Sequence, residues 1–229
     1  MNGGAIKTAV VTGAHGFSVV DFHHLFRGLE GVDCYIQHLD DFACATEAER
    51  DSYDAVVLYF FVHPYSVGDA GKGEPQDAEE PWFFARKPRA AIEHLGDTQQ
   101  GIVVLHHALL TYPDWSLLNQ MVGIEDRSFA AHFDQHLRID VADTRHPITE
   151  GIASWEMGDE TYTMADAQEG SEILLTTAHA KSMRTIGWTR EHKQARVFCF
   201  QSGHDNQTWQ EPGFRQVLQR GIHWVSRRI

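Results

Sequence analysis

Four short apolar segments of this chain each run into a histidine. They comprise residues 9–14 before His15, residues 34–37 before His38, residues 101–105 before His106 and His107, and residues 196–203 before His204. Nearly continuous apolar runs of this length are typical of parallel strands that are covered on both faces. Because the carboxyl ends of parallel strands meet at one edge of a sheet, and open α/β sheets bind ligands there, the pattern predicts a site as well as a fold.

Helical patterns separate these strands. Apolar residues recur at helical spacing after Ser18, which is a suitable N-cap: Val19, Phe22, Leu25, Phe26 and Leu29. Further helices are predicted at 45–52, before a strand at 55–61; at about 82–95, before the strand at 102–105; and from Asp114, as the cap, to Gly123. The alternation predicts an α/β fold with a doubly wound, mainly parallel sheet of the flavodoxin-like or class I glutamine amidotransferase-like kind.

The pattern changes after Gly123. Residues 137–141 alternate between apolar and polar, which predicts an edge or antiparallel strand. Short strands are predicted at 173–176 and 186–188, then a strand at 196–200 and a closing amphipathic helix at 214–225. Residues 66–81 are rich in Gly, Pro and acidic residues and predict a loop. Since no linker interrupts the chain, we expect one α/β domain over residues 1–229, with extra C-terminal strands.

Composition narrows the classes of function. A chain of 229 residues with 42% hydrophobic residues can bury a substantial core. The formal net charge of −13 argues against nucleic acid and anionic membranes as partners, because both require clustered Lys and Arg. No stretch is long and apolar enough to span a bilayer. The N-terminus lacks a signal-peptide pattern, and three cysteines without a C-x-x-C motif fit a reducing cytoplasm. No G-x-G-x-x-G follows the first strand, so we expect no nucleotide cofactor.

Histidines at neighbouring strand ends are suited to chemistry. An imidazole acts as a general acid or base near neutral pH, or as a metal ligand. The predicted sheet brings His15, His106 and His204 side by side, whereas His38 ends a more lateral strand and is expected to be peripheral. His106 and His107 are adjacent, so we expect only one of them to face the crevice.

The turn after the fourth strand is where several α/β enzymes hold a nucleophile on a strand-to-helix elbow. Residues 105–108 read Leu-His-His-Ala and contain no thiol or hydroxyl. Acyl transfer through a covalent intermediate is therefore disfavoured, and acid–base or metal chemistry remains. His204 with Asp205 lies where such folds supply a base. A carboxylate from residues 159–162 would complete the cluster, although their spacing alone favours a solvated acidic turn.

Taken together, these motifs resemble the trehalose-utilization (ThuA-like) family, whose members have a class I glutamine amidotransferase-like fold. The resemblance rests on residues 11–15, 101–108 with Trp115, 146–149, 159–162, 196–205 with Trp209, and 221–224. It implies a role in the metabolism of disaccharides or their 3-keto derivatives. It also implies that His106 replaces the amidotransferase cysteine at the elbow, with His204 and Glu160 beside it. Residues 59–63 depart from the expectation, because they are more apolar than a substrate pocket suggests.

Three sets of residues follow from these considerations. His106, His204 and Glu160 are the expected catalytic groups. The same three residues with His15 would bind zinc or another divalent ion. His107, Tyr162, Asp205 and Trp115 would contact a small carbohydrate.

The leading hypothesis is a hydrolase, isomerase or lyase of sugars or keto-sugars, and not a glutamine amidotransferase. The alternative is a non-catalytic carbohydrate-binding or regulatory protein; a purely structural role for the histidines and a homo-oligomer stay open. The enzyme hypothesis requires that His106, His204 and Glu160 lie within roughly 6–7 Å of one another, the span that a metal or water could bridge.

Overall fold

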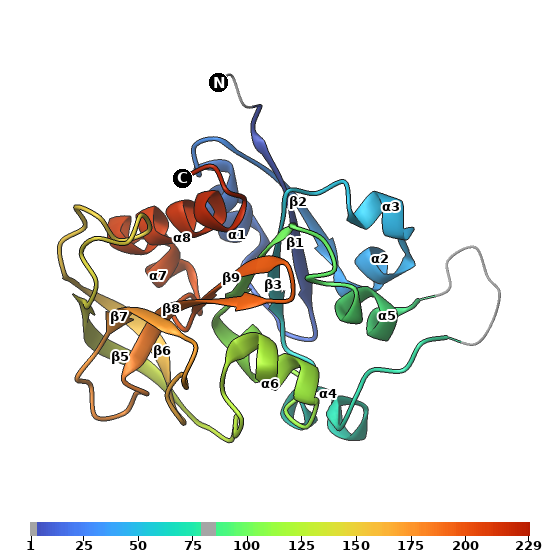
Figure 1. Cartoon of the computed structure of the whole chain (residues 1–229). Helices are drawn as coiled ribbons and strands as arrows, with labels where there is room; N and C mark the ends of the chain where they lie inside the picture. The colour runs from blue at the N-terminus through green and yellow to red at the C-terminus, as the bar shows by residue number, and fades with distance from the viewer. Residues whose placement is uncertain (1–3, 79–85) are drawn as a thin grey trace.

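One nine-stranded mixed sheet forms the centre of the computed structural model, which describes residues 4–78 and 86–229. The strand order is β2-β1-β3-β4-β9-β8-β7-β5-β6 (Figure 1). The part from β2 to β9 is parallel, and each later pair is antiparallel. The strands are Ile6–Gly13 (β1), Val32–His38 (β2), Ala55–Phe60 (β3), Gly101–Leu105 (β4), Ala130–Val141 (β5), Trp155–Thr163 (β6), Glu172–Thr176 (β7), Thr185–His192 (β8) and Ala195–Phe200 (β9).

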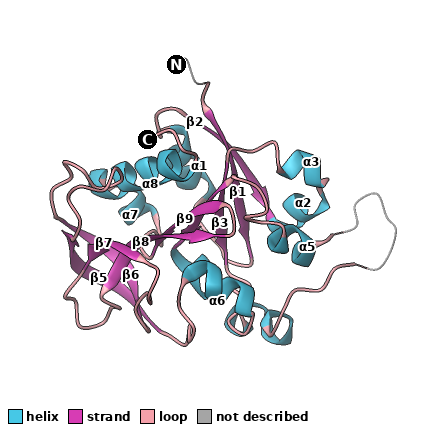
Figure 2. Ribbon diagram, in the orientation of Figure 1, coloured by secondary structure: helices cyan, strands magenta, loops and turns pink. Residues whose placement is uncertain are grey.

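Helices cover both faces of the parallel part of the sheet (Figure 2). On one face lie α1 (Val19–Arg27), α7 (Asn206–Gln210) and α8 (Pro212–Val225). On the other lie α2 (Leu39–Cys44), α5 (Pro88–Glu93) and α6 (Ser116–Val122). Two short helices, α3 (Glu47–Arg50) and α4 (Pro64–Val67), and two 3-10 helices, η1 (Gly68–Gly71) and η2 (His106–Leu110), connect these elements.

The two faces explain why the central strands β3 and β4 are apolar throughout. On β4, Val103 and Leu105 belong to the core under α1 and α8, whereas Ile102 and Val104 belong to the core under α2 and α6. Successive side chains of a strand point to opposite faces, so a strand buried on both sides has no polar positions. The prediction of a doubly wound, mainly parallel α/β sheet with extra C-terminal strands is confirmed.

Several predicted elements differ in detail. Of the helix expected at 82–95, the structure describes only α5; Trp82, Phe83 and Phe84 lie outside the described residues. The predicted loop at 66–81 contains the end of α4 and η1. Trp115, not Asp114, is the N-cap of α6. Val19 is 58% exposed although its helical spacing placed it in the core.

The largest correction concerns residues 159–162. The interpretation of this segment as a solvated acidic turn is wrong, because it lies within β6, and Asp159, Glu160 and Tyr162 are buried. The pattern misleads because the carboxylates of Asp159 and Glu160 are satisfied by groups from distant segments rather than by water.

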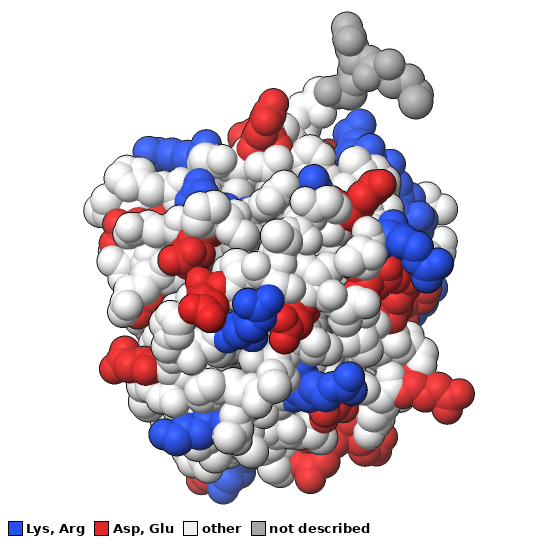
Figure 3. Space-filling model, turned by 90° about the vertical axis from the view of Figure 1, so that its left-hand side faces the viewer, with Lys and Arg blue, Asp and Glu red and all other residues white. Residues whose placement is uncertain are grey.

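Side chains of both charges lie on the face that Figure 3 shows. Acidic side chains are interspersed among the basic ones over most of this face, and several basic side chains gather along its upper right edge. Within residues 4–78 and 86–229, no helix has the length and apolar character needed to cross a membrane.

Candidate functional site

Three predicted residues from three elements meet at the carboxyl end of the parallel strands. His106 follows β4, His204 follows β9, and Glu160 belongs to β6. Oε2 of Glu160 lies 3.1 Å from Nε2 of His106 and 2.6 Å from Nδ1 of His204, and these two nitrogens are 3.2 Å apart. The hydroxyl of Tyr162, two residues along β6, lies 2.7 Å from Nε2 of His106. We call His106, Glu160, His204 and Tyr162 the histidine–carboxylate cluster.

The backbone turns sharply at His106. Its φ of 53° lies in the left-handed region, which is uncommon for a residue other than glycine. Such conformations persist where the surrounding structure enforces them, and they are concentrated at functional sites. The chain therefore forms a strand-to-helix elbow here, with a histidine at its tip.

The tautomer of His106 follows from its contacts. Nδ1 lies 2.7 Å from the carbonyl oxygen of Gln201, which only accepts hydrogen bonds, so Nδ1 carries a proton. In the neutral ring, Nε2 then accepts a hydrogen bond from the hydroxyl of Tyr162. A backbone carbonyl that fixes the tautomer in this way is typical of histidines that bind metals or act as bases.

Asp159 holds β6 against the end of β9, although the two strands are far apart in the sheet order. Its carboxylate accepts hydrogen bonds from the backbone N–H groups of Gly203 (2.9 Å), His204 (3.0 Å) and Glu160 (2.9 Å). Gln201 adds a bond from its side-chain amide to the carbonyl of Glu160. These contacts bring Glu160 to the sheet edge where His106 lies.

Burial and charge act in opposite directions on the ionisable groups. Burial raises the pKa of Glu160, but the hydrogen bonds of His106 and His204 outweigh it and hold the pKa well below the ordinary value. Burial lowers the pKa of His204, but the hydrogen bond and charge of Glu160 reverse this and raise it. Burial and the nearby Glu160 raise the pKa of Tyr162 well above 10, so the phenol keeps its proton.

His15 and His107 form a second layer beside the cluster. Their rings stack with centroids 4.3 Å apart. Burial, together with the charge of His106, lowers the pKa of both. His107 is 2% exposed, and neither ring nitrogen makes a hydrogen bond of ordinary geometry with a described residue; a weaker interaction with the Tyr59 backbone opposes its desolvation only in part. Nδ1 of His15 likewise makes no hydrogen bond of ordinary geometry with a described residue, and a weaker interaction with the Gly16 backbone opposes its desolvation only in part.

Two pockets adjoin the cluster. One, of about 200 Å³, is lined mainly by aromatic rings and by His15, His107, Glu160 and Tyr162. The other, of about 400 Å³, is lined by polar residues of β5 and β6 and by His204 and Asp205. Ligand sites are typically concave, with a few converging polar groups, so these pockets are where a substrate would meet the cluster.

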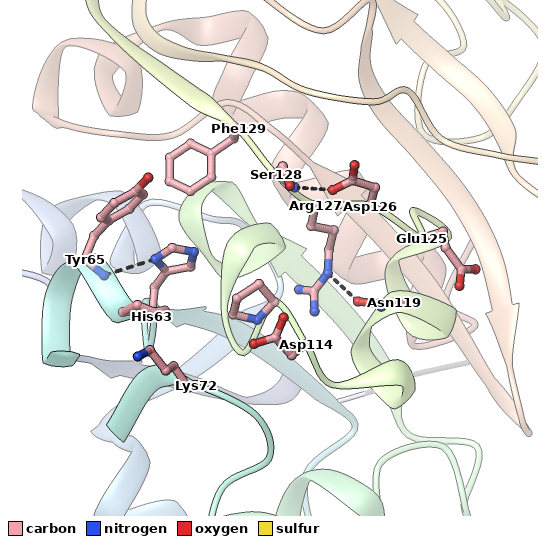
Figure 4. Close-up of a pocket in the computed structure, with 12 residues that line it drawn as sticks. His63, Tyr65, Lys72, Asp114, Asn119, Glu125, Asp126, Arg127, Ser128 and Phe129 are labelled. Carbon is pink, nitrogen blue, oxygen red and sulfur yellow. Dashed lines mark hydrogen bonds between the residues drawn. The ribbon is translucent and has the colours of Figure 1, made fainter. Parts of the chain in front are cut away.

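A larger pocket of about 700 Å³ lies beyond Tyr65 and Phe129, which it shares with the aromatic pocket. Figure 4 shows His63 and Arg127 inside it. Arg127 is 1% exposed, and it donates to Asn119 and to three backbone carbonyls, those of Leu109, Thr111 and Tyr112. With its hydrogen bonds directed into the protein, Arg127 supports the loop after η2 rather than a ligand.

Some of the remaining predicted residues lie at the site, and others lie away from it. Asp205 lines the polar pocket, where its carboxylate caps α7 through the N–H of Gln207. Trp115 is not at the site, because it is 2% exposed and packs with Tyr112 in the core under α6. His15 stacks beside the cluster and is not among its ligating atoms. His38 caps α2 at the end of β2, as a peripheral residue would.

Sequence reasoning did not select Asp159 or Phe133. Asp159 precedes Glu160 in the buried strand β6. Had a strand been predicted for residues 155–163, two adjacent carboxylates within it would have indicated buried acidic groups with specific partners. Phe133 lines both pockets that adjoin the cluster. Its position depends on an irregularity of β5, for which the sequence carries no signal.

Comparison with protein families gives one match. The model of the ThuA family, described as trehalose utilisation, matches residues 76–225. This range contains all four residues of the histidine–carboxylate cluster, whereas His15 lies before it. No curated protein matches the sequence significantly.

Solved structures share the fold at low identity. A protein described as ThuA-like from Parabacteroides merdae superimposes with a TM-score of 0.69 at 18% identity, covering 97% of this chain and 90% of that one. A cytoplasmic protein from Salmonella typhimurium gives 0.64 at 13%, covering 96% and 98%. A glutamine amidotransferase from Thermotoga maritima gives 0.51 at 10%, covering 96% and 98%. The fold is therefore of the class I glutamine amidotransferase-like kind.

Proposed function

Because the chain belongs to the trehalose utilisation (ThuA) family, we propose that it is an enzyme of carbohydrate metabolism that acts on a sugar or keto-sugar. The reaction is a hydrolysis, isomerisation or elimination that needs no covalent nucleophile. His106, His204 and Glu160 carry it, and Tyr162, His107 and Asp205 contact the substrate. The histidine–carboxylate cluster is the observation that supports this proposal.

The polar atoms of the cluster hold protons between them. When His106 is neutral, the hydroxyl of Tyr162 donates to its Nε2 at 2.7 Å, and a protonated His204 donates from Nδ1 to Oε2 of Glu160 at 2.6 Å. An imidazolium beside an ionised carboxylate is a favourable pair in a buried site. A divalent metal ion would take the place of these protons, because it would bind the same nitrogen and oxygen atoms.

The donor set fits a metal ion of the zinc type. Nε2 of His106, Nδ1 of His204 and Oε2 of Glu160 all lie within 4.8 Å of one another. Ligands of a tetrahedral ion with bonds of about 2.0 Å are about 3.3 Å apart, so only the Glu160–His204 contact would have to open. Such an ion would supply Lewis-acid chemistry, by polarising a carbonyl oxygen or by lowering the pKa of a water.

Without a metal, the same residues form an acid–base pair. The low pKa of Glu160 keeps its carboxylate ionised beside His204, and the raised pKa of His204 favours an imidazolium that donates a proton and, once neutral, accepts one. Tyr162 holds a protonated hydroxyl 2.7 Å from His106 and orients that ring. Either form moves protons at a sugar hydroxyl or carbonyl.

Amidotransferase chemistry is disfavoured at this site. That reaction uses a thiol at the elbow, and this elbow carries His106. The nearest cysteine along the neighbouring strand, Cys199, is 0% exposed and packs in the core under α6. Burial raises the pKa of its thiol, which further disfavours a nucleophilic role.

The second candidate function is non-catalytic carbohydrate binding. The ring nitrogens of His107, which make no hydrogen bond of ordinary geometry with a described residue, favour a site that hydrogen-bonds a ligand, and binding alone would use them. The two functions differ in whether Glu160 is needed for turnover or only for affinity.

The decisive experiment begins with metal analysis of untagged protein that has been purified without added metal. Wild-type protein is compared with His106→Asn, because Asn tolerates the left-handed backbone, and with His38→Asn as a strand-end control. Stoichiometric metal that only His106→Asn loses supports the metal form. Metal-free wild type whose turnover of a glycoside or keto-sugar requires Glu160 supports the acid–base form. Binding without turnover by metal-loaded protein supports the second function, and neither binding nor turnover overturns both.

A further inference from the structure

We propose that Phe133 is a specificity-determining residue that divides the site into two compartments and selects substrates that fill both of them. This inference rests on the proposed function and deepens it by naming the residue that sets the preference for two rings over one. It comes from the two pockets beside the cluster and from the irregularity of β5 that separates them.

The two pockets share two residues, Phe133 and Glu160. Every other residue that lines the aromatic pocket differs from those that line the polar pocket. A ligand that fills both pockets would therefore contact both Phe133 and Glu160 where the pockets adjoin. At about 200 and about 400 Å³, the pockets together fall within the range of small-molecule sites, and the smaller one alone falls below it.

A β-bulge places Phe133 opposite Glu160. His132 pairs with Thr161 and Gln135 pairs with Asp159, so two residues of β5, Phe133 and Asp134, face the single residue Glu160. Asp134 has a φ of 51°, in the left-handed region. Bulges of this kind occur next to active sites, where they redirect a side chain. Here the redirected side chain is Phe133, whose ring lies beside that of His204.

The exposure of Phe133 is otherwise unexplained. Its side chain is 62% exposed, which is unusual for a phenylalanine beside a buried cluster. Its ring centroid lies 5.9 Å from that of His204, with the rings at 63°. An exposed aromatic face beside polar groups is suited to stacking on the apolar face of a sugar ring. The free energy gained by covering this ring is available only when a ligand is bound.

The two compartments differ in chemistry. The aromatic one contains Phe61, Phe129 and Tyr65, and its polar groups include ring nitrogens of His15 and His107 that have only weak backbone partners among the described residues. A ring with hydroxyl groups would give these nitrogens stronger hydrogen bonds. The other compartment presents carboxylate, amide and imidazole groups: Asp134, Gln135, His136, Asp205 and Gln207. One ring is therefore enclosed, and the second is held by an open polar surface.

The test measures how strongly the protein prefers two rings over one. Dissociation constants for methyl glucoside, trehalose and maltose are measured by calorimetry for wild type, Phe133→Ala and Phe133→Trp; kcat/KM replaces Kd where a sugar is turned over. We expect wild type to bind at least one disaccharide roughly tenfold more tightly than methyl glucoside. Phe133→Ala should reduce this preference roughly fivefold to tenfold. Phe133→Trp, which keeps an aromatic ring at this position, should retain the preference of wild type.

Tyr35→Ala is the matched control, because Tyr35 is an exposed aromatic residue (43%) on β2, at the opposite edge of the sheet. It should leave the preference unchanged. A folded Phe133→Ala protein with the full preference overturns the role of Phe133 while the proposed function stands. Wild type that binds methyl glucoside as tightly as both disaccharides overturns the two compartments. Wild type that binds none of the three sugars counts against the proposed function itself and removes the basis of the inference.

Discussion

Nδ1 of His204 lies 2.6 Å from Oε2 of Glu160, in a position where the carboxylate is only 6% exposed. Each charge favours the ionised form of the other, against the effect of burial on both. The raised pKa of His204 contributes stability that is complete below pH 6.5 and is lost as pH rises through the folded-state pKa. The lowered pKa of Glu160 contributes stability above its ordinary range that is lost as pH falls through the folded-state pKa. The pair is therefore most stabilising at mildly acidic pH.

Glu160→Gln should separate these effects while keeping the shape of the side chain. Without the carboxylate, burial dominates, and the pKa of His204 should fall below that of wild type. Turnover should fall by roughly 100-fold or more, the usual contribution of a positioned acid or base. NMR titration of the His204 ring in metal-free protein checks the first expectation, and steady-state kinetics check the second.

Glu156→Gln is the control for this substitution, because Glu156 is exposed on the same strand. It should change neither the titration nor the turnover. An unchanged His204 titration in Glu160→Gln would mean that the pair does not control the protonation of this ring.

The parallel half of the fold could be predicted because its strands are local and unambiguous. Consecutive residues such as Val103 and Val104 are both apolar and point to opposite faces of the sheet. A strand of this kind is stable where helices cover both faces. The histidines at the strand ends were then placed by topology alone, and the structure brings His106 and His204 to 3.2 Å.

The other half of the site depends on contacts that a sequence does not display. Glu160 reaches the cluster because Asp159 binds two backbone N–H groups more than 40 positions away. Phe133 faces it because one extra residue interrupts the pairing of β5 with β6. The prediction that Trp115 contacts the substrate was wrong because closeness in sequence to the elbow does not place a side chain at the site. Trp115 packs instead in the core under α6.

Asp159→Asn should show that Asp159 is a positioning residue. The amide keeps one acceptor oxygen but replaces the other with a donor, so at least one backbone N–H loses its acceptor and the others lose a charged one. Hydrogen bonds to charged groups contribute about 1.5–3 kcal/mol, and we expect a comparable loss in the free energy of unfolding. Urea denaturation measures this loss, and the amide NMR shifts of Gly203 and His204 should move.

Asp33→Asn, at an exposed position of β2, serves as the comparison. It should stay within about 0.5 kcal/mol of wild type, as surface substitutions usually do. If Asp159→Asn changed the free energy of unfolding as little as Asp33→Asn, the position of the end of β9 would not depend on this carboxylate.

Arg127→Met should destabilise the protein without touching the cluster. Its guanidinium is 1% exposed and bonds to three backbone carbonyls and to Asn119, while burial lowers its pKa to about 10. Methionine fills much of the volume but leaves the carbonyls without donors, which should cost about 3 kcal/mol. Arg138→Met removes an exposed ion pair with Asp140 and should cost less than about 1 kcal/mol. Equal losses in urea denaturation would contradict the structural role of Arg127.

His192→Gln should make the protein less sensitive to acid. His192 is 8% exposed, and burial, together with the charges of Lys193 and Arg190, lowers its pKa to about 4. In the unfolded chain His192 binds a proton near pH 6.5, whereas in the folded protein it does so only near pH 4. The free energy of unfolding therefore decreases as pH falls from 6.5 to 4. Between pH 7.5 and 5.0 this single group accounts for a loss of about 2 kcal/mol. Urea denaturation at both pH values should show that the free energy of unfolding of His192→Gln decreases by about 2 kcal/mol less than that of wild type. The control His24→Gln, at an exposed position of α1, should lose as much as wild type. A wild-type pH dependence in His192→Gln would place the acid sensitivity on the other buried histidines, His107 and His146 among them, whose pKa values burial also lowers.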